Sequence, residues 1–312
     1  MRLVRVSTRT SLRVWALAGA VALLACRERA GKAVNDSTQP TVLPGEAASP
    51  RPSTYTWDRN TLGSFFVVPG PEPSTAYLID PRFDADQSLD TLRVDAGEWE
   101  GASAELFSGA EASGRARLVL GSRDTTAGCI SWPEVQLEGE GLPARWRVGF
   151  AAGTAFTLAL DSLPAMAQRD SVRLTIAIAR ATSRLPGDTS TAFHGRPFVV
   201  RQAVRFALDS ALVVVVAEVL RSVSQEANPL QEQTLVFLEA AGGDSLLRPA
   251  YFERRVGREE DVEGIDVVAA LRLPRGGAIL LRRETQDGLA FGLYERSSGG
   301  WQLRWRSATA TC

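Results

Sequence analysis

The sequence predicts an α+β protein that is predominantly antiparallel β-sheet, with one or two helices packed on it. Most apolar segments are short and stop at glycine, proline or Asp-Gly turns, as strands of antiparallel sheets do. Four such segments follow one another with only short turns between them over residues 267–307. One long segment, residues 170–185, also carries a helical repeat of apolar residues. Together these observations indicate a β-rich fold with little helix.

The N-terminus has the features of an export signal. Four arginines precede residues 14–24, an uninterrupted apolar run of about 11 residues. A membrane-spanning helix needs roughly 20 apolar residues, so this run suits the core of a secretion signal. It ends in Leu-Leu-Ala-Cys at residues 23–26, which resembles the lipobox of bacterial lipoprotein precursors. The resemblance covers residues 1–26 and implies that Cys26 receives diacylglycerol, becomes the new N-terminus and is acylated there.

The alternative is an ordinary signal peptide cut elsewhere, or a buried apolar helix. With a lipidated Cys26 the protein is expected in the cell envelope, held by its acyl chains. Arg27 follows the cysteine where an inner-membrane retention signal has Asp, which favours the outer membrane, facing the periplasm or the surface.

Residues 27–54 are expected to form a disordered tether. They contain four prolines among Ser, Thr, Gly and Ala, and they have no helical or alternating apolar period. A coil of this length has a root-mean-square reach of about 30 Å. The tether therefore separates a folded region, residues 55–312, from the lipid.

Composition excludes several classes of function. The formal net charge is −1, so no excess of basic residues favours nucleic acid. Lys32 is the single lysine, which leaves no P-loop, no Ser-Lys hydrolase and no Schiff-base chemistry in the folded region. One histidine, together with two cysteines that lie far apart, does not meet the usual zinc patterns. We therefore expect no cofactor and no metal site, and no set of catalytic residues can be named.

The first part of the folded region, residues 55–126, is expected to be a small β-rich subdomain. A segment that ends at Pro69-Gly70 and another that ends at Asp80-Pro81 are the clearest strands, because both stop at strong breakers. The expected strands are residues 65–68, 75–79, 89–94, 104–107 and 115–120.

The second part, residues 127–312, is expected to be an α+β domain that ends in a β-meander. Residues 146–150 and 155–160 look like strands, and Asp161-Ser162 before Leu-Pro-Ala offers a helix cap. Residues 170–185 alternate like a strand but also share a helical face. Their length and the Pro186-Gly187 stop favour a helix.

The remaining segments read as strands. Residues 198–208 and 211–223 face each other across a turn, and the apolar run 212–217 predicts a central strand covered on both faces. Asp287-Gly288 is a strong hairpin signal in the meander. The other expected strands are residues 233–240, 267–273, 278–285, 289–296 and 301–307.

Two local patterns have both a functional and a structural interpretation. An acidic stretch has the spacing of a calcium loop, but Leu89 replaces the glycine that this loop needs. We therefore interpret it as an acidic turn, formed by Asp84, Asp86, Ser88, Asp90 and Asp95. His194 stands in a turn-like stretch, where a surface or capping role is favoured over that of a general base.

The C-terminal region holds two further patterns of this kind. The charge run over residues 253–263 is interpreted as a solvated hairpin with exposed ion pairs, although it could present a polar partner surface. Trp301 and Trp305 have the same parity, so we expect them on one face of the last strand, with Leu303 between them, as part of the core.

The other two cysteines are expected to form a disulfide. Once Cys26 carries lipid, Cys129 and Cys312 remain, and the export signal places both in an oxidising compartment. The bond would fix the C-terminus and close residues 127–312 into one unit. The alternative is a pair of unbonded thiols.

The sequence thus predicts a lipid-anchored envelope protein of unknown role, a non-catalytic binding or interaction module rather than an enzyme. Its expected partners are the membrane and either an envelope protein or a small molecule. The alternative is an envelope hydrolase that uses two carboxylates, for example on glycans, because acid pairs leave no local motif. Two carboxyls about 5–10 Å apart in a cleft would favour the hydrolase, whereas a shallow apolar patch would favour partner binding.

Overall fold

The computed structural model describes residues 56–85, 96–120, 131–187, 190–223, 228–241, 246–274, 276–286 and 288–311. All of them belong to one compact unit, residues 38–312. The signal segment, the tether, Cys26, Cys129 and Cys312 lie outside the described residues. So do the expected strand 89–94 and every member of the acidic turn except Asp84.

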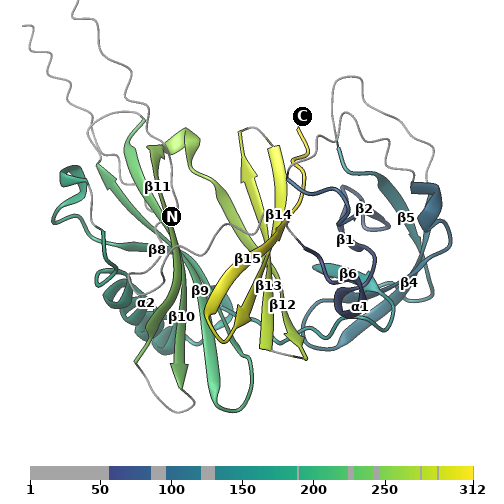
Figure 1. Cartoon of the computed structure of the whole chain (residues 1–312), viewed down its shortest axis with the longest axis horizontal. Helices are drawn as coiled ribbons and strands as arrows, with labels where there is room; N and C mark the ends of the chain where they lie inside the picture. The colour runs from purple at the N-terminus through teal and green to yellow at the C-terminus, as the bar shows by residue number, and fades with distance from the viewer. Residues whose placement is uncertain are drawn as a thin grey trace, which may run out of the picture. The chain divides into compact units, whose positions relative to one another are not determined.

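The prediction of a predominantly antiparallel β fold is confirmed. The strands form a closed six-stranded barrel, a five-stranded sheet and a four-stranded sheet (Figure 1). One substantial helix, α2, covers residues Gln168–Thr182. The other helical elements are single turns: α1 (Arg59–Leu62), η1 (Ala96–Trp99), η2 (Leu163–Ala165), η3 (Thr191–Phe193) and η4 (Glu259–Asp261).

The barrel has the strand order β1-β2-β5-β4-β3-β6. Alternate side chains fill its interior, among them Val67, Leu78 and Leu106, which are fully buried. Gly149 leaves room there, because a Cβ at this position would lie 2.6 Å from Val67 Cγ2 and 2.7 Å from Leu106 Cδ2. Residue 126, the boundary expected from the sequence, falls between β4 and β5. The barrel strands are β1 (Phe66–Pro69), β2 (Thr75–Ile79), β3 (Ser103–Phe107), β4 (Ala112–Leu120), β5 (Glu134–Glu138) and β6 (Val148–Ala151).

The five-stranded sheet has the order β11-β10-β9-β8-β7. The apolar run at residues 212–217 begins β9, and this strand is central, as predicted. One face of the sheet is covered by α2, whose Ile178 and Ala181 pack with Val215, Ala217 and Val236. The predicted helix over residues 170–185 is therefore confirmed. The strands are β7 (Asp161–Ser162), β8 (Val199–Ala207), β9 (Leu212–Val223), β10 (Leu230–Ala241) and β11 (Arg248–Arg258).

The four-stranded sheet is the predicted C-terminal meander, in the order β12-β13-β14-β15. It is buried on both faces. Ile279 and Leu281 pack against Phe237 of the five-stranded sheet, whereas Leu280 packs in the cluster that contains Phe66 of the barrel. The meander therefore separates the other two sheets. Its strands are β12 (Gly264–Leu273), β13 (Gly276–Thr285), β14 (Gly288–Ser297) and β15 (Gly300–Arg306).

Two expectations in this region are wrong. Trp301 and Trp305 are both buried, but they lie in different core clusters, because a bulge in the β14–β15 pairing shifts the register between them. Residues 155–160 do not form a strand. They make one isolated bridge, Thr157 to Leu271, because only the backbone amides of Leu158 and Arg272 donate across this contact.

Candidate functional site

A group of interacting charged and polar residues lies where the five-stranded sheet packs against the meander. Side chains alternate along β10, so Leu235 and Phe237 enter the apolar core between the sheets, and Gln233 follows on the same face. At the level of Gln233, charged and polar side chains take the place of the apolar side chains between the two sheets. The intersheet cluster comprises Glu218, Gln233, Tyr251, Glu253, Arg255, Glu263, Arg283 and Tyr294.

Glu253 accepts hydrogen bonds from three sides. The hydroxyl of Tyr251 donates to its Oε1 at 2.5 Å, and the hydroxyl of Tyr294 donates to the same oxygen at 2.7 Å. Nη2 of Arg283 donates to Oε2 at 2.5 Å. The carboxylate is thus saturated with donors from β11, β13 and β14.

Glu263 connects this group to the rest of the cluster. Its Oε2 lies 2.8 Å from Nη1 of Arg255 and 3.3 Å from Nη1 of Arg283. The side-chain amide of Gln233 donates to the backbone carbonyl of Glu263 and, at 2.8 Å, to Oε1 of Glu218. Glu263 and Glu253 therefore share the guanidinium group of Arg283.

Burial and neighbouring groups shift the pKa values of Glu253 and of the two tyrosines that donate to it. Burial raises the pKa of Glu253, but the charge of Arg283 and the hydrogen bonds from Tyr251, Tyr294 and Arg283 outweigh burial, so its pKa lies below the ordinary value. Burial likewise raises the pKa of Tyr251 and of Tyr294. Both phenols therefore stay protonated as donors, and Glu253 stays ionised as an acceptor.

This arrangement corrects the interpretation of the charge run as a solvated hairpin. The side chains of Glu253, Arg254 and Glu263 are only 13%, 8% and 2% exposed. Of the charged residues in the run, only Arg258 and the turn η4 (Glu259–Asp261) are exposed as expected. The strand alternation sends Glu253 to the meander and Arg254 to the opposite face, where other parts of the chain cover both.

A second buried charged group, on the α2 side of the same sheet, was not found from the sequence. Nε and Nη2 of Arg221 donate to Oε1 of Glu232 at 2.9 and 2.6 Å, and Nε of Arg254 lies 3.6 Å from the same oxygen. The Arg221 guanidinium also lies over the rings of Phe193 and Phe198, 5.5 and 4.6 Å from their centroids. The sequence feature that could have indicated this group is the occurrence of two opposite charges, Arg221 and Glu232, within long apolar strands.

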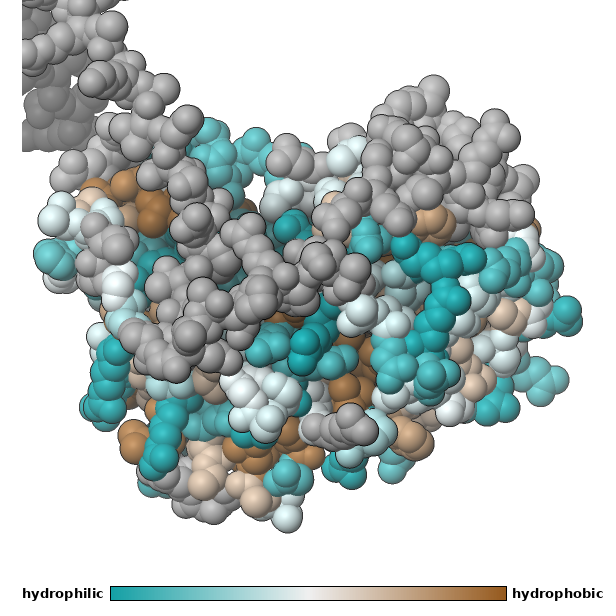
Figure 2. Space-filling model, in the orientation of Figure 1, coloured by the Kyte–Doolittle hydropathy of each residue, from teal (hydrophilic) through white to brown (hydrophobic). Residues whose placement is uncertain are grey.

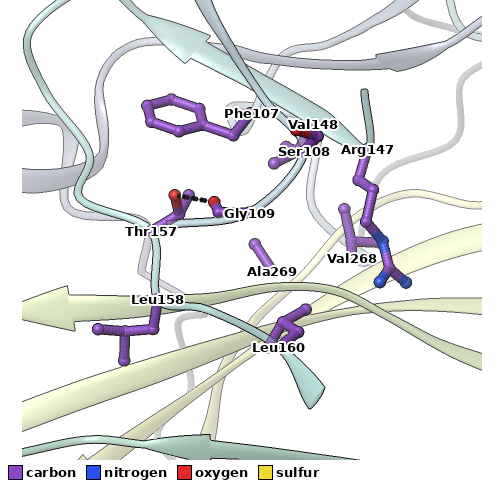
Figure 3. Close-up of a pocket in the computed structure, with 10 residues that line it drawn as sticks. All are labelled: Phe107, Ser108, Gly109, Arg147, Val148, Thr157, Leu158, Leu160, Val268 and Ala269. Atoms are coloured by element: carbon purple, nitrogen blue, oxygen red, sulfur yellow. Dashed lines mark hydrogen bonds between the residues drawn. The ribbon is translucent and has the colours of Figure 1, made fainter. Parts of the chain in front are cut away.

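A small pocket lies between the barrel and the meander (Figure 3). Its cavity volume is only about 10 Å³, far below the roughly 300 Å³ at the lower end of small-molecule sites. The hydroxyl of Thr157 donates to the carbonyl of Gly109 at 2.7 Å. Arg147 lines the pocket and donates to the carbonyl of Val267 and to Oδ1 of Asp266, at 2.8 and 3.3 Å. Its lining residues include no carboxylate.

The remaining candidates stay apart from these groups. His194 is exposed and lies at the end of η3, where its backbone amide donates to Thr191. No group of three or more His, Cys, Asp or Glu side chains in the described part of the chain is arranged to hold a metal ion. Glu253 and Glu263 are two neighbouring carboxylates that converge on Arg283, which compensates their charge. The lowered pKa of Glu253 does not suit a proton donor.

Comparison with known proteins gives no assignment, since no protein-family model, curated protein or solved structure matches the chain. Among the residues that the structure describes, no helix has the length and apolar character needed to cross a membrane.

Proposed function

We propose that this chain is a lipid-anchored protein of the cell envelope, and that its folded region is a binding or interaction module. The observation that carries the proposal is the apolar run at residues 14–24 that ends at Cys26 behind a cationic N-terminus. Buried acyl methylenes contribute about 0.8 kcal/mol each, and more than one chain makes anchoring durable. A proline-rich tether then holds the β-rich unit away from the bilayer.

The two buried charged groups described above support a non-catalytic role. The buried carboxylates Glu232, Glu253 and Glu263 pair with arginines inside the two charged groups, where they compensate charge between packed sheets. Such pairing suits a structural role, because a general acid near neutral pH needs a raised pKa, and that of Glu253 is lowered.

The test is the substitution Cys26→Ala in cells that express the full chain. We expect it to abolish incorporation of a fatty-acid probe and to release the protein from the membrane fraction. Cys129→Ala is the matched control and should keep both properties. A Cys26→Ala protein that is cleaved normally and still sediments fully with membranes would refute the proposal.

A further inference from the structure

One face of α2 carries a stripe of exposed cations around two exposed apolar residues. The helix advances about 100° per residue, so residues 169, 172, 173, 176, 180 and 184 fall within one third of its circumference. Val172 and Ile176 are 52% and 45% exposed. We call this stripe the outer face; its other members, all exposed, are Arg169, Arg173, Arg180 and, in the turn after the helix, Arg184.

In the described part of the chain these four arginines differ from the buried ones in lacking acidic partners. Within the described residues none of them forms a salt bridge, whereas Arg221, Arg254 and Arg283 all do. Asp170 is the one acidic residue of the helix, and it lies in the first turn. The outer face is therefore strongly cationic. Figure 2 shows that hydrophobic residues also lie among hydrophilic ones elsewhere on the visible face of the molecule.

We propose that the outer face docks on the anionic lipid headgroups of the membrane that holds the anchor, an inference that rests on the proposed function. Guanidinium groups bind phosphate through two parallel hydrogen bonds. Exposed branched side chains between them enter the headgroup boundary, as in interfacial helices. The tether, with a reach of about 30 Å, is long enough to let the folded region turn this face to the bilayer.

The expected effect is large because the charges act together. A basic residue near an anionic membrane contributes about 1 kcal/mol, or roughly fivefold in affinity. Four such residues together favour the docked state by up to several hundredfold. Docking also removes the guanidinium groups from solvent, which makes their chemical reactivity a direct readout.

The experiment uses the purified lipidated protein in phosphatidylcholine vesicles with and without phosphatidylglycerol. Phenylglyoxal modifies accessible arginines, and mass spectrometry gives the rate at each site. We expect the four outer-face arginines to react at least fivefold more slowly on anionic vesicles, in line with ~1 kcal/mol per residue. Salt at about 1 M, where the Debye length is ~3 Å, should abolish the protection. Internal controls are four exposed arginines without salt bridges elsewhere in the described residues, Arg59, Arg145, Arg248 and Arg272.

Two variants separate lipid docking from simple charge attraction. Val172→Ser with Ile176→Ser should weaken the protection, whereas Val199→Ser, at a residue 58% exposed on β8, should not. Equal rates at outer-face and control arginines on anionic vesicles would refute the inference. Protection by soluble polyphosphate but not by vesicles would also refute it, in favour of a soluble acidic partner.

Flotation of the same samples separates the two proposals. Flotation with neutral vesicles reports the anchor alone. A protein that floats with neutral vesicles but shows no protection on anionic ones keeps its anchor and loses the docking face. A protein that floats only with anionic vesicles keeps the docking face and loses the anchor.

Discussion

Arg283→Met removes the cation that the two carboxylates of the intersheet cluster share. The Arg283 side chain is 5% exposed, and its Nη2 and Nη1 lie 2.5 and 3.3 Å from Glu253 and Glu263. Loss of one partner of a buried ion pair destabilises a protein by roughly 3–5 kcal/mol. Glu253 keeps two tyrosine hydroxyls and Glu263 keeps Arg255 at 2.8 Å. We therefore expect the lower end of that range, about 3 kcal/mol.

The neighbouring arginine is the matched control. Arg282 points to the opposite face of β13, its side chain is 47% exposed, and it lies 4.0 Å from Asp266. An exposed pair of this kind contributes ~0–1 kcal/mol, so Arg282→Met should have little effect. Urea denaturation of both variants gives the two free energies of unfolding.

The pH dependence identifies the cause. The pKa of Glu253 is lowered from 4.5 in the folded state, so its stabilising contribution is present above about pH 4.5 and is lost as pH falls through the lowered pKa. The stability gap between the parent and Arg283→Met should therefore shrink in acid. A gap that is independent of pH, or no larger than that of Arg282→Met, would refute the argument.

Two other predictions concern the barrel and the cysteines. Gly149→Ala should destabilise the protein by ~1–3 kcal/mol in urea unfolding, because the added methyl group overpacks the barrel interior. Gly109→Ala is the control and should not destabilise it, because a Cβ at this position meets nothing within 4 Å. Equal effects of the two substitutions would contradict the packing argument. Thiol counting on unfolded, unreduced mature protein should find Cys129 and Cys312 unreactive, and two reactive thiols would exclude the disulfide.

The elements that the sequence predicts well are those determined by local pattern. Strands such as 75–79 stop at Asp-Pro, and the meander is punctuated by short turns, so both follow from residues close in the chain. The helix over 170–185 was ambiguous in apolar period, because Val172 and Ile176 fit either element. The structure leaves both exposed and buries Ile178 and Ala181 instead.

The features that the sequence did not reveal depend on distant parts of the chain. Glu253 belongs to a run of charges that resembles a solvated hairpin, and its burial requires Tyr294 and Arg283 from the meander. Trp301 and Trp305 illustrate a second limit. Parity along a strand assigns faces only while the register is regular, and a single bulge reverses the assignment.

The buried charges also specify how the central strands pair. Residues 212–217 are apolar on both faces, so a slip of β9 by one residue would leave its hydrophobic pattern almost unchanged. Arg221 lies directly opposite Glu232 in the β9–β10 pairing, and both are at most 4% exposed. A one-residue slip would turn Arg221 toward the meander and leave Glu232 buried without it, at a cost of several kcal/mol. The Arg221–Glu232 ion pair thus disfavours a slip of β9 by any odd number of residues. The valines of β9 cannot do this, because they are apolar on both faces of the strand.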